Sequence, residues 1–306
     1  MTNTLTPRVW IELLLLALLW GGSFLAIRTA LDEIGVLSVV AHRVVWAALC
    51  LWLVVLLRRL VLPRGWRIWA AFLVMGCLNN VIPFTLMAWG QLHVETGLTA
   101  ILNAATAIWG VLVAALVFSD ERLTLRRGLG VALGFVGVAT AIGLANLTSL
   151  DLRSLAQLAI IGGTVSYALA GSWARATLRG QPPMVSAAGM LTPSALVMLP
   201  LAWAVEGPLP MSLTPVTWGA VAYFALASTA LAYVLYYRIL AAAGAGNLLL
   251  VTLMIPPVAI VLGAAVRGEA LTPAAYLGFG LLAAGLLVLD GRLERVARRR
   301  LTEERP

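Results

Sequence analysis

Apolar residues fill most of this chain in long runs, and the lengths of those runs predict its secondary structure. Ten runs of roughly 17 to 25 residues can be marked, which is the length that an α-helix needs to cross the hydrocarbon layer of a membrane. They span residues 9–27, 37–57, 69–89, 98–118, 129–145, 155–174, 184–205, 216–237, 247–266 and 271–289. The pattern predicts an all-α integral membrane protein with ten transmembrane helices.

Composition excludes a water-soluble protein. Of the 306 residues 61% are hydrophobic and 11% are charged, and the mean hydropathy is +0.97. A soluble chain of this length needs far more charge to cover its surface. The two cysteines, Cys50 and Cys77, both fall within predicted spans, which argues against a disulfide framework or a zinc cluster. We expect neither a metal nor a cofactor.

The positive charges predict how the chain is oriented. All 21 basic residues are arginines, and 17 of them fall in alternate loops or in the carboxyl-terminal tail. The opposite loops hold only Arg28, Arg153 and Arg267, and Arg43 lies within the second run. This asymmetry predicts that both termini are cytoplasmic and that the protein is a multi-pass protein of the inner (plasma) membrane. A basic tail at an anionic leaflet explains the net charge of +8 without nucleic acid as a partner.

The second half of the chain repeats the first. Adding 148 to the numbers of Glu121, Leu123 and Thr124 gives Glu269, Leu271 and Thr272, and a shift of 149 aligns Asn79 and Asn80 with Ser228 and Thr229. We therefore predict a five-helix repeat at residues 1–148, a second at 149–292 and a basic tail at 293–306. Because five is odd, the second repeat enters the membrane inverted. Inverted repeats are typical of secondary transporters, which hold substrate near the midplane.

Several segments resemble a known family. They are "LLWGGSFLAIRTAL" followed by "HRVVWAAL", the paired "DERLT" and "GEALT", and "LMIPPVAIVLGAAVRGE". These resemble the drug/metabolite transporter superfamily, specifically its ten-helix EamA-type permeases, and among them the aromatic amino-acid exporters. The resemblance implies that spans one to four and six to nine surround a central cavity, with five and ten outside. Ile108 and Trp109 stand where the second repeat has Pro256 and Pro257, so helix distortion need not be symmetric.

Polar and aromatic side chains inside the spans are the candidates for binding a substrate. The expected cavity residues are Trp20, Ser23, Asn79, Asn80, Phe84, Asn103, Trp109, Tyr167, Trp173, Ser228, Thr229 and Tyr233. The adjacent amides of Asn79 and Asn80 cannot be satisfied by lipid, so at least one must face protein or water. Pro83 also leaves the carbonyl of Asn79 without its helical partner. The alternative is that both amides only hold helices together.

Charged side chains within or near the spans are candidates for gating, because intramembrane charge usually has a function. Arg43 could pair with Asp32, Glu95 or Glu269 to close an outer gate, or could form a structural ion pair. Glu121 and Glu269 occupy equivalent ends of the fourth and ninth spans. Each is either a gate partner or a cap for the turn before the next helix.

A stripe of small residues marks the fifth span. Gly130, Gly134 and Gly137 lie three or four residues apart, which gives a face for close helix packing. This face contacts either neighbouring helices of the same chain or a second copy of the protein.

Together these features predict a secondary transporter, not an enzyme. It would export small metabolites, foremost amino acids including aromatic or large neutral ones, by alternating access. The partners expected are the small-molecule substrate and membrane lipid. The resemblance implies that a proton-coupled cation exporter of this superfamily has a carboxylate at mid-depth in the first span. This chain has none there, which disfavours proton-coupled export of drug cations. The alternatives are a lipid or sugar-lipid flippase, a channel, and an intramembrane serine protease that uses Ser23 and His42.

Overall fold

A computed structural model describes residues 6–121, 123–143, 151–248 and 250–290, and these residues form helices joined by short loops, with no strand among them. The helices of the first half are α1 (Pro7–Ala30), α2 (Val36–Leu57), α3 (Trp66–Gly76), the π-helix η1 (Cys77–Val81), α4 (Ile82–Gly90), α5 (Thr96–Asn103), α6 (Thr106–Val117) and α7 (Leu125–Ile142). Those of the second half are α9 (Leu152–Thr177), α10 (Pro183–Glu206), α11 (Pro215–Ala222), the π-helix η2 (Tyr223–Leu231), α12 (Ala232–Leu248), α13 (Leu250–Arg267) and α14 (Pro273–Asp290).

The helical stretches agree with the predicted membrane spans. Within the described residues, nine of them are long and apolar enough to cross a membrane, and they match the first nine predicted runs. The tenth run corresponds to α14, whose apolar stretch, Pro273–Leu289, is shorter than the others. An all-helical integral membrane protein is therefore confirmed. The count of ten spans stays a prediction, and the predicted tail lies outside the described residues.

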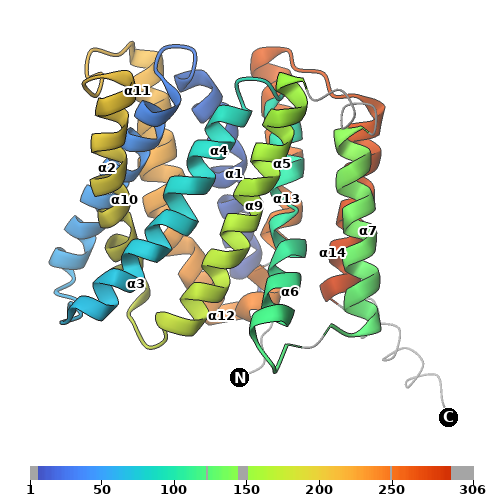
Figure 1. The fold of residues 1–306 in the computed structure, drawn as a ribbon, viewed down its shortest axis with the longest axis horizontal. Coiled ribbons are helices and arrows are strands. Elements are labelled where there is room, and N and C mark those ends of the chain that lie inside the picture. Colours follow the sequence, from blue (N-terminus) through green and yellow to red (C-terminus); the bar gives the residue numbers. More distant parts are fainter. Residues whose placement is uncertain (1–5, 122, 144–150, 249, 291–306) are drawn as a thin grey trace.

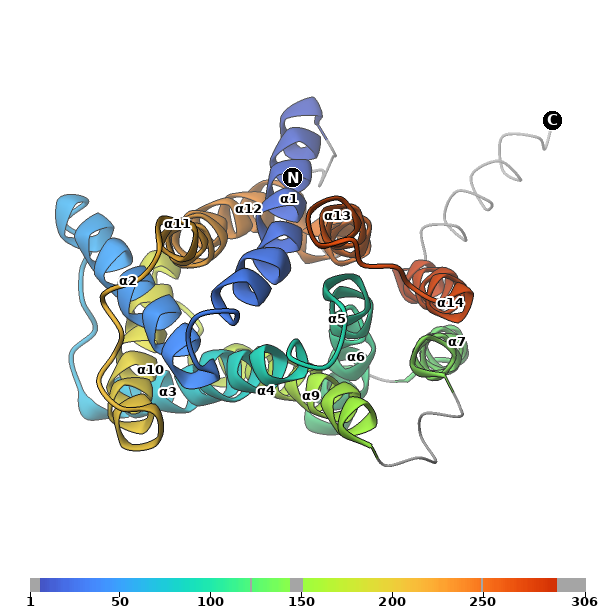
Figure 2. The same ribbon diagram turned by 90° about the horizontal axis from the view of Figure 1, so that it is seen from above.

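The helices form a ring with one pair beside it. Figure 2 shows the ring from above, running through α1, α12 and α11, α2, α10, α3 and α4, α9, α5 and α6, and α13, which returns to α1, with α7 and α14 to one side. Figure 1 shows that α1 begins and α14 ends at the same end of the bundle. We call this end, which holds Pro7, the proximal end, and the opposite end the distal end.

Glycines bring α7 and α14 into close contact. A Cβ atom added at Gly137 would lie 2.5 Å from the backbone nitrogen of Leu282, and one at Gly130 would lie 2.9 Å from the carbonyl oxygen of Gly285. Only a residue without a side chain allows the two backbones to approach so closely. The glycine stripe of the fifth span is therefore used for packing within the chain.

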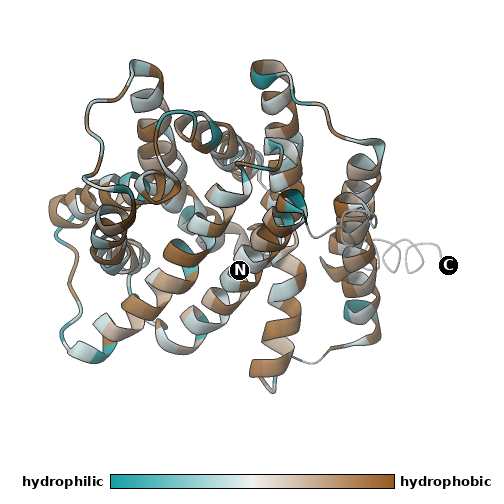
Figure 3. Cartoon of the chain, turned by 45° about the horizontal axis from the view of Figure 1, so that its top comes forward, coloured by the Kyte–Doolittle hydropathy of each residue, from teal (hydrophilic) through white to brown (hydrophobic). Residues whose placement is uncertain are grey.

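The outward surface of the bundle is apolar. Leu116 and Leu125 are 87% and 82% exposed, and many other leucines and valines on the helices point outward. Figure 3 shows hydrophobic residues along the helices, with the hydrophilic residues mainly at helix ends and in loops. Such a surface would aggregate in water but is suited to lipid tails.

The third and eighth spans each widen into a π-helix at the position of their polar pair. Asn79 and Asn80 lie in η1, and Ser228 and Thr229 lie in η2. In η1 the backbone N–H of Ile82 bonds to the carbonyl of Cys77, five residues back, directly before Pro83. In η2 the hydroxyls of Ser228 and Thr229 both donate to the carbonyl of Phe224, at 3.2 and 2.7 Å. Hydroxyls that bond to the backbone in this way disturb the regular helical ladder.

The fourth span is broken, which the apolar run at 98–118 did not predict. It consists of α5 and α6, separated at Ala104 and Ala105, and the hydroxyl of Thr106 donates to the carbonyl of Asn103 at 2.8 Å. The ninth span, by contrast, continues as α13 through Pro256 and Pro257. Distortion is therefore asymmetric, as expected, but the break lies in the half that lacks the prolines.

Candidate functional site

An arginine in the interior of the bundle gathers side chains from both halves of the chain. Arg43 on α2 donates from Nε to the Thr229 hydroxyl of η2 at 3.1 Å, and its guanidinium lies 3.8 Å from the centre of the Phe84 ring of α4. Tyr167 of α9 and Tyr233 of α12 lie close enough to interact with it electrostatically. We call Arg43, Phe84, Tyr167, Thr229 and Tyr233, together with Asn79, the arginine cluster.

The two amides of η1 have different surroundings. Asn80 is fully buried and donates to the Ser194 hydroxyl of α10 at 3.0 Å, whereas Asn79 keeps accessible surface. Asn79 donates to the Tyr233 hydroxyl at 3.1 Å and to the side-chain oxygen of Asn80 at 3.2 Å. Adjacent residues on a helix point about 100° apart. One amide therefore joins neighbouring helices, and the other joins the arginine cluster.

Trp20 of α1 contacts the other half of the chain beside this cluster, whereas Ser23 bonds within α1. The indole N–H of Trp20 donates to the carbonyl of Ser228 at 3.1 Å, and its ring lies 5.9 Å from that of Tyr236. Ser23 donates to the carbonyl of Trp20 at 2.6 Å, so its hydroxyl is used within α1. Ser228 is thus contacted through its backbone, and its own side chain is buried.

Within the described part of the chain, three of the expected cavity residues have their hydrogen bonds or ring contacts away from the arginine cluster. Trp109 packs edge-on against Phe135 of α7 at 4.9 Å, which places it toward the outer helix pair. Trp173 donates to the carbonyl of Ala71 and lines a surface pocket of about 500 Å³ that is also bordered by Trp66. Asn103 lies at the break in the fourth span, where its carbonyl accepts a bond from Thr106. The direction in which each of these side chains points depends on the rotation of its helix, and hydropathy along the sequence does not report that rotation.

The gate partners suggested for Arg43 are engaged elsewhere. Glu95 pairs with Arg153 at 2.7 Å, Asp32 pairs with Arg28 and Arg267, and Glu269 bonds to Thr96. Among the described residues Arg43 forms no ion pair with any of these three carboxylates. The hypothesis that Arg43 closes an outer gate by pairing with one of them therefore does not hold for this conformation.

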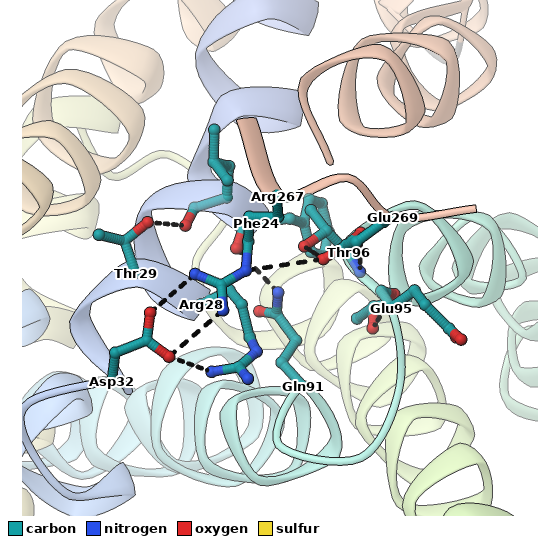
Figure 4. Close-up of polar contacts among 11 residues, drawn as sticks. Phe24, Arg28, Thr29, Asp32, Gln91, Glu95, Thr96, Arg267 and Glu269 are labelled. Carbon is teal, nitrogen blue, oxygen red and sulfur yellow. Dashed lines mark hydrogen bonds and ion pairs between the residues drawn. The ribbon is translucent and has the colours of Figure 1, made fainter. Parts of the chain in front are cut away.

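A polar network at the distal end links α1, α4, α5 and the end of α13 (Figure 4). Glu269 accepts from the backbone N–H and the hydroxyl of Thr96, both at 2.8 Å, and so caps the start of α5. Gln91, just after α4, donates to the carbonyl of Phe24 at 2.8 Å. We call these two contacts, together with the Arg28–Asp32–Arg267 pairs, the distal network.

Asp32 holds two arginines from opposite halves of the chain. Arg28 donates to it at 2.8 Å from the preceding turn of α1, and Arg267 donates to it at 2.7 Å from the end of α13. The hydrogen bond from Arg267, followed by the nearby positive charges, lowers the pKa of the Asp32 carboxyl below its ordinary value. Arg28, Arg153 and Arg267, the three exceptions to the arginine asymmetry, thus all bind distal carboxylates. These three arginines stood out in the sequence because the other loops on their side lack arginine. The sequence alone did not show which carboxylates they bind.

The proximal end has ion pairs of its own. Glu12 of α1 pairs with Arg238 of α12 and with Arg8. Glu121, the repeat equivalent of Glu269, pairs with Arg127 and with Arg175 of α9. The two equivalent glutamates therefore differ: Glu269 caps a helix of the other half of the chain, whereas Glu121 binds arginines.

The residues suggested for a serine protease do not form a catalytic pair. The Ser23 hydroxyl is bonded to its own helix, as described above. The two ring nitrogens of His42 contact the carbonyl of Pro210 at 2.9 Å and the indole N–H of Trp46 at 3.1 Å. Because an indole N–H only donates, the Nδ1 atom must accept and the Nε2 atom must carry the proton. His42 is therefore a buried, hydrogen-bonded histidine of the helix packing.

The described residues contain no group of three or more His, Cys, Asp or Glu side chains that could hold a metal ion. Cys50 and Cys77 are both free thiols.

Comparison with known proteins identifies the family. Residues 9–143 and residues 154–289 each match the EamA-like transporter family. The chain belongs to the EamA-like transporter family. This family membership and the helical architecture together support a multi-pass membrane transporter of small metabolites.

Individual relatives are distant but cover most of the chain. A probable terminal-alkyne amino-acid exporter of Streptantibioticus cattleyicolor is 28% identical over 94% of this chain and 95% of the relative. An uncharacterised transporter of Bacillus subtilis, YwfM, is 25% identical over 90% of this chain and 92% of the relative. A protein of known crystal structure shares the fold with a TM-score of 0.66 at 18% identity, over 92% of this chain and 96% of that one.

Proposed function

We propose that this protein is a secondary transporter that exports amino acids, including aromatic or large neutral ones, by alternating access. The observation that carries the proposal is the arginine cluster, in which a guanidinium, the Asn79 amide and several aromatic rings from both halves of the chain meet inside the bundle. Flat apolar walls with a few fixed polar groups are suited to a zwitterionic solute with a large side chain. The amino-acid exporter among the relatives has the same kind of substrate in its name.

Alternating access in this proposal depends on the inverted repeats, residues 1–148 and 149–292. Two observations support them: the family matches each half separately, and both halves widen into a π-helix at equivalent polar pairs. Two inverted five-helix repeats give ten spans, with the proximal end at the cytoplasm of the inner membrane. The split between the repeats, 144–150, lies outside the described residues.

Transport into proteoliposomes tests the proposal. The panel should contain large and small amino acids, nucleosides and quaternary amines, each measured with and without an imposed pH gradient. We expect uptake of large neutral amino acids, with competition among them, at rates far below those of a channel. Transport of permanent cations alone would refute the amino-acid proposal, and scrambling of labelled lipid in the same vesicles would favour a flippase.

The orientation has its own test. A cysteine placed in the carboxyl-terminal tail, in a background without Cys50 and Cys77, should not react with a membrane-impermeant maleimide added to intact cells, but should react after the cells are opened. Labelling of intact cells would show that the orientation is reversed.

A further inference from the structure

Arg43 has hydrogen-bonding capacity that the protein does not use. Of its guanidinium nitrogens only Nε forms a hydrogen bond among the described residues, with Thr229. The two terminal nitrogens have no partner there, and they are not among the fully enclosed side-chain atoms without a hydrogen bond. They are therefore open to water or to a ligand. A guanidinium presents these two N–H groups as a planar fork that fits the two oxygens of a carboxylate.

The surroundings make an added anion favourable. An arginine within a membrane-spanning helix is costly to insert, and such residues usually pair with an opposite charge or with backbone carbonyls. Here the contacting groups are the Phe84 ring and the Thr229 hydroxyl, neither of which carries a charge. The positive charge of Arg43 is therefore not neutralised by any described side chain in contact with it.

A directional chain of hydrogen bonds leaves a second group free close by. The Ser194 hydroxyl donates to the carbonyl of Met190, so its oxygen accepts from the Asn80 amide nitrogen. The Asn80 oxygen then accepts from the Asn79 amide nitrogen, which also donates to the Tyr233 hydroxyl. This order fixes the side-chain oxygen of Asn79 as the remaining acceptor. An acceptor of this kind suits an ammonium group.

We infer that Arg43 binds the carboxylate of the transported molecule through its two terminal nitrogens, with Thr229 holding the guanidinium in place. The inference rests on the proposed function and adds to it the group that recognises the acid end of the substrate. Phe84 and Tyr167, whose rings lie 6.5 Å apart, provide apolar surface beside the fork. The free oxygen of Asn79 accepts from the ammonium group. Because Arg43 comes from the first half of the chain and Thr229 from the second, the bound carboxylate lies where the two halves meet.

Matched ligands separate recognition of the carboxylate from recognition of the rest. The probes are phenylalanine, phenylalaninamide, which lacks the carboxylate, and 3-phenylpropionate, which lacks the ammonium group. Binding is measured as the ligand-induced thermal shift of the purified full-length protein, and transport as competition in proteoliposomes. We expect the wild-type protein to prefer phenylalanine to its amide by at least about tenfold, and to bind 3-phenylpropionate measurably.

Variants of Arg43 test whether this residue causes the preference for the acid over the amide. Arg43→Gln should reduce the preference for the acid over the amide to about one, and Arg43→Lys should keep part of it, because a lysine retains the charge but not the fork. Thr229→Val should weaken the preference without abolishing it. Arg126→Gln is the matched control: Arg126 is likewise a hydrogen-bonded arginine on a helix long enough to cross a membrane, but it donates to the carbonyl oxygens of Val288 and Leu289 at the α7–α14 pair, outside the ring. It should leave the ratio unchanged even if the protein becomes less stable.

The outcomes distinguish this inference from the proposed function. If amino acids are transported and folded Arg43→Lys and Arg43→Gln both keep the full preference for the acid, the inference is wrong and the function stands. If amino acids are not transported but 3-phenylpropionate stabilises the wild-type protein and not Arg43→Gln, the carboxylate site stands and the substrate assignment is wrong. If neither transport nor carboxylate binding is found, both are wrong. Should Arg43→Gln fail to fold, the ratios of Arg43→Lys and Thr229→Val decide the matter.

Discussion

Removing the Glu269 carboxylate should release the distal end of the bundle. Glu269 makes two hydrogen bonds of 2.8 Å to Thr96, and its side chain is only 14% exposed. Hydrogen bonds to a charged group contribute about 1.5 to 3 kcal/mol each in favourable surroundings. Both bonds share one carboxylate, and contributions of neighbouring contacts are not additive, so we take about 2 kcal/mol for the pair, less than twice the lower end of this range. If the bonds exist only while the distal end is closed, Glu269→Ala should raise the population open at that end by about 30-fold.

Cysteine accessibility measures this population. Ser228 is 1% exposed in the present conformation, so a Ser228→Cys variant without Cys50 and Cys77 should react slowly with a membrane-impermeant maleimide added from the distal side. Adding Glu269→Ala should speed the reaction by about the factor above, and Glu269→Gln by less, because the amide oxygen still accepts one of the two bonds.

The repeat supplies the control for this experiment. Glu121→Ala removes the equivalent glutamate at the proximal end, where the carboxylate binds Arg127 and Arg175. It should not speed labelling from the distal side. Equal rates in the wild-type protein and Glu269→Ala would refute the reasoning, as would an acceleration by Glu121→Ala of the same size.

Four further substitutions test other parts of the structure. Asn79→Leu should abolish most transport in proteoliposomes while the yield of folded protein stays nearly unchanged, because water can replace the hydrogen bonds that the partners of Asn79 lose. Asn80→Leu should lower the free energy of unfolding by about 1 kcal/mol, because it removes two hydrogen bonds of about 0.6 kcal/mol each; thermal unfolding measures this. The hydrogen bond from Arg267 lowers the pKa of Asp32, so the stabilising effect of this carboxylate is present above the ordinary value of 3.8 and is lost only as the pH falls below it. The distal labelling rate, divided at each pH by the rate of the same cysteine in unfolded protein to remove the titration of the thiol, should therefore stay constant from about pH 8 to 5. Asp32→Asn should raise this ratio throughout that range. Gly137→Leu should lower thermal stability, because its side chain meets the backbone of α14, while the acid-to-amide ratio of the folded fraction stays unchanged.

Sequence reasoning located the polar pairs but not their roles. The repeat aligned Asn79 and Asn80 with Ser228 and Thr229, and the structure places all four in π-helices. It also required that at least one amide face protein or water, and both have hydrogen-bond partners. Which amide joins a neighbouring helix and which joins Arg43 depends on the rotation of the third span and on the residues opposite it.

Aromatic residues show the same limit. Phe84, Tyr167 and Tyr233 do surround Arg43, whereas Trp109, chosen on the same grounds, faces Phe135 on the outer pair. All four are large side chains within apolar spans, and nothing in their immediate sequence separates them. A shift of one residue turns a side chain by about 100° around the helix, so depth alone could not select the residues that face Arg43.

The sequence by itself determined those features that depend on the lipid solvent, namely the spans and their helical structure. Lipid acts on each segment locally, through its length and hydropathy, and the unpaired backbone groups require a helix, so the spans and the all-helical membrane fold could be predicted without any tertiary contact. Only the tertiary structure decided which distant residues meet. Arg43 and Thr229 are 186 residues apart, and the carboxylates suggested for Arg43 bind other arginines or a helix start instead. Those pairings result from the packing of many helices at once. Each helix must bury its small residues and satisfy its polar groups against neighbouring helices, and its own sequence does not determine which helices those are.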